Sequence, residues 1–120
     1  MIHVIVASPS PADALIGHIL DRLDGPWCTH VVSLAHGRER PCDQRAADAL
    51  EHLALDDDVW RHGTWALVAP EDSSLAICLL VEIYGRSGRL PHLIDPQQHC
   101  DGMLVDLAQQ RAIARCRRIR

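Results

Sequence analysis

The strongest constraint on the fold is the alternation of short apolar runs with amphipathic stretches along the chain. Residues 2–7 read IHVIVA and residues 27–34 read WCTHVVSL. Both runs are short and rich in β-branched residues, which is typical of buried strands. Two further runs, TWALVAP at 64–70 and PHLID at 91–95, predict a third and a fourth strand.

Apolar residues at helical spacing occupy the segments between these strands. They predict helices over residues 11–23, 46–54 and 101–118, and another helix that begins near Ser73 with Asp72 or Ser73 as its N-cap. Strand and helix therefore alternate four times, which implies a mainly parallel four-stranded sheet flanked by helices. The predicted fold class is α/β, a small Rossmann-like (flavodoxin-like) domain.

Length and composition fit a single domain over residues 1–120. Hydrophobic residues make up 48% of the chain and charged residues 23%, as in an ordinary soluble protein. No apolar run reaches the roughly 18 residues of a membrane span, and no basic segment precedes the first apolar residues. We therefore expect a cytoplasmic protein without membrane contact. The formal net charge of −4 argues against binding to duplex nucleic acid.

Four loops lie where an open parallel sheet binds its ligands, beyond the carboxyl ends of the strands. Serine hydroxyls and helix amino ends in these loops can donate hydrogen bonds to phosphate, and arginines can pair with it. The alternative is that the serines only cap helices and the arginines are only solvated. The candidate ligand-binding residues of the first three loops are Ser8, Pro9 and Ser10, then His36, Arg38 and Arg40, and then Asp72, Ser73 and Ser74.

Two helices carry an unusual surface. The helix predicted to begin near Ser73 is apolar almost all round from Leu75 to Ile83. A second subunit is therefore expected to cover part of it, and a homodimer is predicted. The last helix, within residues 101–120, is rich in arginine. Its arginines either complement the carboxyl end of the helix dipole or bind an anion.

Other chemistry is weakly signalled. His92, His99 and Cys100 can ligate zinc, as can Cys28 and His30, but neither group has a paired spacing, so no metal is expected. No Gly-x-Gly-x-x-Gly motif follows the first strand, and the chain has no lysine for a Walker-type loop. No cofactor is therefore expected.

The segment Gly85-Arg86-Ser87-Gly88-Arg89 resembles a phosphate-binding loop in composition. It connects the carboxyl end of a helix to the start of a strand, however, so it lies at the edge of the sheet opposite the four loops. Geometry therefore favours a turn in which Gly85 or Gly88 caps the helix in a left-handed conformation.

Residues 64–94 resemble the carboxyl half of a family of small CRISPR-associated proteins found with type III systems. That family carries a strand ending in a proline-containing loop, an Ala- and Leu-rich helix, and a His-Gly-Arg-Met-Gly-aromatic-Pro type segment. The segment from Tyr84 to Pro91, YGRSGRLP, is similar to it, although Tyr84 and Ser87 replace the usual His and Met. The opening strand and its Ser-Pro-Ser-Pro loop also resemble the start of the family. Arg86 lies within the matching segment and completes the candidate ligand-binding residues.

The resemblance implies a Rossmann-like dimer that binds a cyclic oligoadenylate, the second messenger of type III CRISPR antiviral defence. Cyclic tetra-adenylate is the expected ligand, and sequestration of the messenger is the first expectation. Cleavage by a metal-independent ring nuclease, in which a ribose 2′-hydroxyl attacks the adjacent phosphate, is the alternative, and no catalytic residue is assigned. Two other classes remain open: a flavodoxin-like protein that binds a mononucleotide, and an interaction module without a small ligand.

Overall fold

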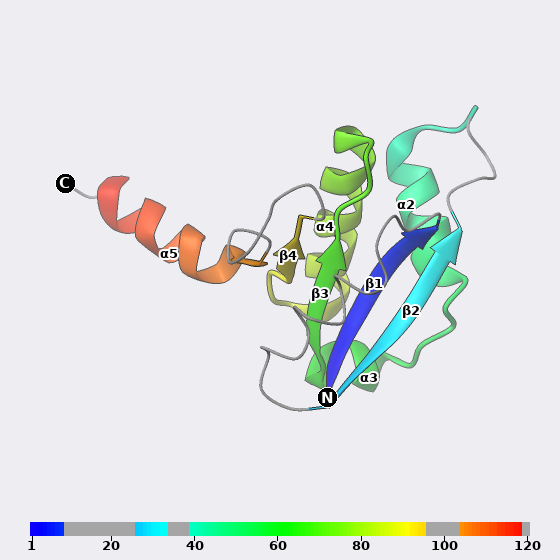
Figure 1. Ribbon diagram of the computed structural model, residues 1–120, viewed down its shortest axis with the longest axis horizontal. Coiled ribbons are helices and arrows are strands. Elements are labelled where there is room, and N and C mark those ends of the chain that lie inside the picture. Colours follow the sequence, from blue (N-terminus) through cyan, green and yellow to red (C-terminus); the bar gives the residue numbers. More distant parts are fainter. Residues whose placement is uncertain (9–25, 34–38, 96–103, 119–120) are drawn as a thin grey trace.

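The fold is built on one mainly parallel sheet (Figure 1). The computed structural model describes residues 1–8, 26–33, 39–95 and 104–118. The sheet has five strands in the order β2-β1-β3-β4-β5. Their bounds are β1 Ile2–Ser8, β2 Trp27–Ser33, β3 Thr64–Val68, β4 His92–Ile94 and β5 Leu104–Asp106.

The fifth strand corrects the predicted four-stranded sheet. β5 pairs antiparallel with β4, with Leu93 opposite Val105, whereas the other neighbouring strands pair in parallel. This pairing covers the edge of β4, whose backbone N–H and C=O groups would otherwise lack partners. The helix predicted over 101–118 is consequently shorter. It is α5, Leu107–Arg118, and the Asp106 carboxylate accepts a hydrogen bond from the Gln109 amide at its start (3.0 Å).

Three of the described helices pack on one face of the sheet (Figure 1). They are α2, Cys42–Glu51, α3, Asp57–His62, and α4, Ser73–Ser87. Leu50 of α2 and Leu79 of α4 lie in one buried cluster with Ile5 and Leu67 of the central strands. The predicted helix over 11–23 lies outside the described residues.

The opposite face of the sheet is also apolar and buried. Val4, Val6, Ala66 and Val68 form a second buried cluster there together with Ile94. Strands that are buried on both faces read as continuous apolar runs rather than alternating ones, which is why the strand positions were predictable. The predicted α/β class is therefore confirmed.

No helix was predicted from the sequence over residues 57–62, where α3 lies. Asp57 and Asp58 occupy its first turn, where carboxylates interact favourably with the helix dipole. Trp60 is buried, and its ring stacks on Trp65 of β3 at a centroid distance of 4.1 Å. The apolar burial of Trp60 thus accounts for a helix in an otherwise acidic stretch.

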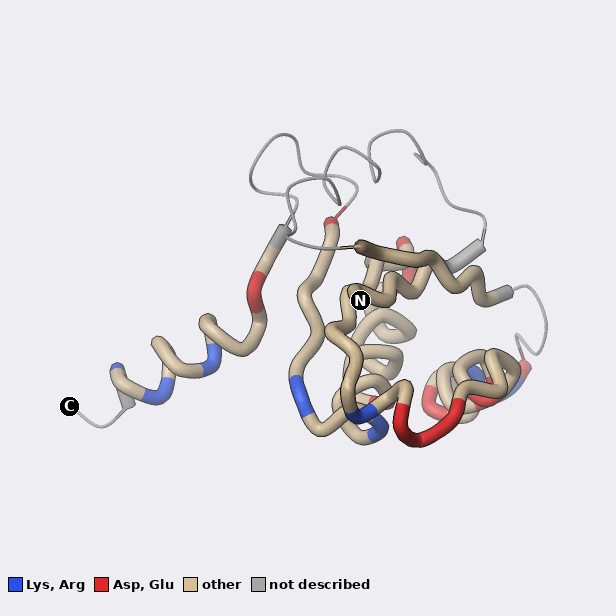
Figure 2. The backbone as a smooth tube through the Cα atoms, turned by 90° about the horizontal axis from the view of Figure 1, so that it is seen from below, with Lys and Arg blue, Asp and Glu red and all other residues tan. Residues whose placement is uncertain are grey.

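The carboxyl-terminal helix α5 projects from the sheet (Figure 1, Figure 2). The described side chains from Ala108 to Arg117 are all exposed, and Figure 2 shows its arginines spread along the projecting part. In the described ranges, no helix is both long enough and apolar enough to cross a lipid bilayer.

Candidate functional site

The order of the strands defines a reversal point between β1 and β3. The chain runs from β1 to β2 on one side, and then returns to place β3 on the other side of β1. β2 and β4, the strands that follow β1 and β3 in the sequence, consequently lie on opposite sides of the β1–β3 pair. In open α/β sheets, the crevice that such a reversal opens at the carboxyl ends of the strands is the usual ligand site. Ser8 ends β1 at this edge, and the loop that leads to Asp72 follows β3.

The amino end of α4 borders this edge. Asp72 is the N-cap of the helix, as predicted, and its carboxylate accepts hydrogen bonds from the amides of Ser74 (3.0 Å) and Leu75 (3.3 Å). Ser73 and Ser74 are exposed. Since Asp72 already engages two of the amides, the serine hydroxyls are the donors that this helix end offers to an incoming phosphate.

Arg40 precedes α2 and is exposed. Its guanidinium forms an ion pair with Asp48, and about half of each side chain is accessible to solvent. An exposed ion pair contributes at most about 1 kcal/mol, so this guanidinium can exchange its carboxylate for a phosphate at little cost. The other predicted residues of the first two loops, Pro9, Ser10, His36 and Arg38, lie outside the described residues.

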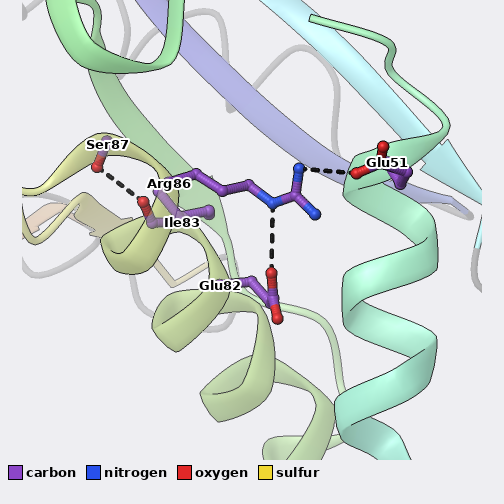
Figure 3. Close-up of polar contacts among 5 residues, drawn as sticks. All are labelled: Glu51, Glu82, Ile83, Arg86 and Ser87. Carbon is purple, nitrogen blue, oxygen red and sulfur yellow. Dashed lines mark hydrogen bonds and ion pairs between the residues drawn. The ribbon is translucent and has the colours of Figure 1, made fainter. Parts of the chain in front are cut away.

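Arg86 lies at the other end of α4. The helix has 15 residues, so its ends are about 22 Å apart at 1.5 Å per residue. The Arg86 guanidinium donates hydrogen bonds to Glu82 (3.3 Å) and to Glu51 of α2 (3.1 Å), as Figure 3 shows, and lies over the Trp60 ring. Within one chain, Arg86 therefore connects helices and does not share a site with Ser73 and Ser74.

The rest of the Gly-Arg-Ser-Gly-Arg segment closes α4. Gly88 adopts a left-handed conformation (φ 78°), and its amide donates to the Tyr84 carbonyl, which makes it the expected helix cap. The Ser87 hydroxyl donates to the Ile83 carbonyl at 2.7 Å (Figure 3). The guanidinium of Arg89 donates to the carbonyls of Arg61 and Gly63, both at 2.9 Å. The segment thus joins α4 to the junction between α3 and β3.

A pocket of about 340 Å³ adjoins this segment. Side chains from α4, β4 and α5 line it, among them Tyr84, Arg89, His92 and Arg111. His92 lies 3.7 Å from the Asp106 carboxylate, so this candidate zinc ligand of the sequence has an acidic neighbour. Its proposed companions His99 and Cys100 lie outside the described residues.

The other pair of candidate zinc ligands acquires a third member. Cys28 and His30 lie on β2, and the ligand atoms of both lie within 4.8 Å of those of His3 on β1. Sequence reasoning missed His3 because it precedes Cys28 by 25 residues and meets it only through the parallel pairing of β1 with β2. His3 could have been found from the sequence by asking which side chains of the first two predicted strands share the inward face of the sheet.

Comparison with known proteins adds no relative. No protein-family model matches the sequence, and neither a curated protein nor a solved structure matches it. The candidate sites consequently depend on the geometry described above.

Proposed function

We propose that a homodimer of this chain binds a cyclic oligoadenylate, with cyclic tetra-adenylate as the first ligand to test, and damps type III CRISPR signalling by sequestering it. The observation that carries the proposal is the reversal of strand order between β1 and β3. It puts the end of β1, with Ser8, beside the loop that leads to Ser73 and Ser74. The resemblance of residues 64–94 to the CRISPR-associated family supplies the class of nucleotide.

The described residues suggest how phosphates are held. The hydroxyls of Ser73 and Ser74 donate to phosphate oxygens, while Asp72 keeps its hydrogen bonds from the amides of Ser74 and Leu75. Arg40 exchanges Asp48 for a phosphate and neutralises its charge. Arg86 keeps its carboxylate partners and contributes to the fold of each subunit.

An exposed apolar stripe on α4 supports the dimer. Ile77 and Val81 are 61% and 64% exposed, and Tyr84 is 41% exposed. These residues are four and three positions apart, so they lie on one face of the helix, away from the buried Leu79. A two-fold dimer that covers this stripe matches the symmetry of a cyclic tetranucleotide and allows both subunits to contribute phosphate ligands.

The experiment that tests the proposal follows labelled cyclic tetra-adenylate in its intact and cleaved forms, first with protein in excess and then with ligand in excess. Retention of one intact ring per dimer supports sequestration. Linear product that accumulates beyond one equivalent per dimer establishes the ring nuclease instead. One ligand per chain favours a mononucleotide-type site. If the protein neither binds nor cleaves the ligand, the proposal is wrong.

Two variants locate the site. Replacing Ser73 and Ser74 together by Ala, or Arg40→Ala alone, is expected to weaken binding by at least about 10- to 100-fold, the value of one charge-assisted hydrogen bond. Arg61→Ala is the matched control, because Arg61 is an exposed arginine at the end of α3 near the opposite edge of the sheet. If Arg61→Ala weakens binding more than Arg40→Ala, the assignment to the carboxyl edge is wrong.

A further inference from the structure

A cluster of two histidines and a cysteine lies on the helix-covered face of the sheet. In the pairing of β1 with β2, His3 is level with Cys28, and Ile5 is level with His30. Alternate residues of a strand point to the same face, so Cys28 and His30 flank His3 from the neighbouring strand. All three side chains are half-buried. The cluster lies at the amino ends of the strands, away from the edge proposed for the nucleotide.

The three potential ligand atoms form a closed triangle. Nδ1 of His3 lies 3.0 Å from Nε2 of His30, and Sγ of Cys28 lies 3.3 Å from the first nitrogen and 3.5 Å from the second. Tetrahedral zinc, with Zn–N of about 2.05 Å and Zn–S of about 2.3 Å, requires N···N and N···S separations of about 3.3 and 3.6 Å. The observed separations fall within a few tenths of an ångström of these values.

The alternative explanation is a chain of hydrogen bonds through His3, Cys28 and His30, which needs only two of these three close contacts. The third contact closes the triangle, and a closed triangle of ligand atoms is what a single ion requires. Burial lowers the pKa of both His3 and His30, and repulsion between the two rings lowers that of His3 further. Neutral imidazoles are the form that binds a metal.

Aromatic packing fixes the orientation of the first ligand. The His3 ring stacks on Trp65 of β3 at a centroid distance of 4.6 Å, and Trp65 in turn stacks on Trp60. The Trp65 indole N–H donates to the Trp60 carbonyl at 3.1 Å. Gly63 adjoins both rings, since an added Cβ there would lie 2.7 Å from Cδ2 of His3 and 3.1 Å from Nε1 of Trp65. A ring packed this closely is pre-organised, which reduces the entropy that binding must overcome.

We propose that His3, Cys28 and His30 form a zinc site with three protein ligands and an open fourth position. One thiolate and two imidazoles suit Zn²⁺, and a trigonal set of the same composition also suits copper. The half-buried position of all three side chains leaves room for water or an exogenous ligand in the fourth position. The inference does not depend on nucleotide binding, since it concerns other residues at the opposite edge of the sheet.

The first test titrates Zn²⁺ into the chelator-treated chain of residues 1–120 against a chromophoric competitor. One equivalent per chain is expected, and Cys28→Ser or His3→Gln is expected to weaken binding by at least about 100-fold, since even loss of an outer partner costs 10- to 100-fold. Cys116→Ser and His62→Gln are matched controls, because both residues are exposed and lie on other elements. Equal affinity of Cys28→Ser and Cys116→Ser would overturn the proposal.

A second test uses the unaltered protein, so it does not depend on variants that fold. Zn²⁺ is expected to protect Cys28 from alkylation while Cys116 continues to react, as read by peptide mass spectrometry. Co²⁺ in place of Zn²⁺ is expected to give thiolate-to-metal charge-transfer absorption. Unchanged alkylation of Cys28 in the presence of Zn²⁺ would refute the site, and an intense visible Cu²⁺ band without stoichiometric zinc binding would refute the assignment to zinc.

Discussion

Replacing Gly63 by Ala is expected to destabilise the fold, because the site has no room for a methyl group. An added Cβ would lie 2.7 Å from Cδ2 of His3, 2.9 Å from the Val59 carbonyl oxygen and 3.1 Å from Nε1 of Trp65. None of these atoms retreats easily. The carbonyl is part of the backbone of α3 and accepts a hydrogen bond from the Gly63 amide, and the His3 ring is stacked on Trp65. Overpacking of this kind costs about 1–3 kcal/mol.

Urea unfolding followed by tryptophan fluorescence measures this cost, since Trp60 and Trp65 are buried. Gly85→Ala is the matched control. An added Cβ at Gly85 meets nothing within 4 Å, and the residue is exposed within α4. Ala is favoured over Gly inside a helix, so this control is expected to gain about 0.5–1 kcal/mol. The two variants thus shift the free energy of unfolding in opposite directions. A Gly63→Ala midpoint at or above that of the wild type would refute the steric reasoning.

Three further predictions concern packing and assembly. Leu79→Ala is expected to lower the free energy of unfolding by about 2–5 kcal/mol, because Leu79 is fully buried between α4 and the sheet; a thermal melt unchanged from that of the wild type would contradict this. A double-mutant cycle between Arg86 and Glu51 is expected to give a coupling energy below about 1 kcal/mol in urea unfolding, since Glu51 is 76% exposed, and a coupling well above that value would show a more buried pair. Substitution of both Ile77 and Val81 by Ser is expected to convert a dimer to a monomer in sedimentation equilibrium without lowering stability of the monomer, and a dimer that persists would place the interface elsewhere.

The central strands were predictable because their residues are apolar on both faces of the sheet. Val4 and Ile5 are each fully buried although they point to opposite faces. The N-cap at Asp72 and the C-cap at Gly88 were predictable for a local reason, since each depends on the conformation of one residue and its neighbours along the chain.

β5 was not predictable from local pattern. It has only three residues, and its pairing with β4 depends on the tertiary position of the chain. α3 was missed because three consecutive aspartates outweigh the signal of a single buried tryptophan in a short window. The contact of His3 with Cys28 and His30 was missed for a similar reason, since the register of β1 on β2 is not encoded by spacing along the chain.

The projection of α5 has a thermodynamic consequence for the carboxyl-terminal part of the chain. The helix has 12 residues, and its described side chains from Ala108 to Arg117 are exposed. A helix of that length is marginal in water by itself, because the cost of the first turn is recovered only over a longer run or by burial of an apolar face. Ile113 is an apolar residue of α5, but it is 46% exposed, so the apolar face of this helix is not buried. Since tertiary packing contributes little along this stretch, α5 can unfold locally while the sheet and α4 remain intact.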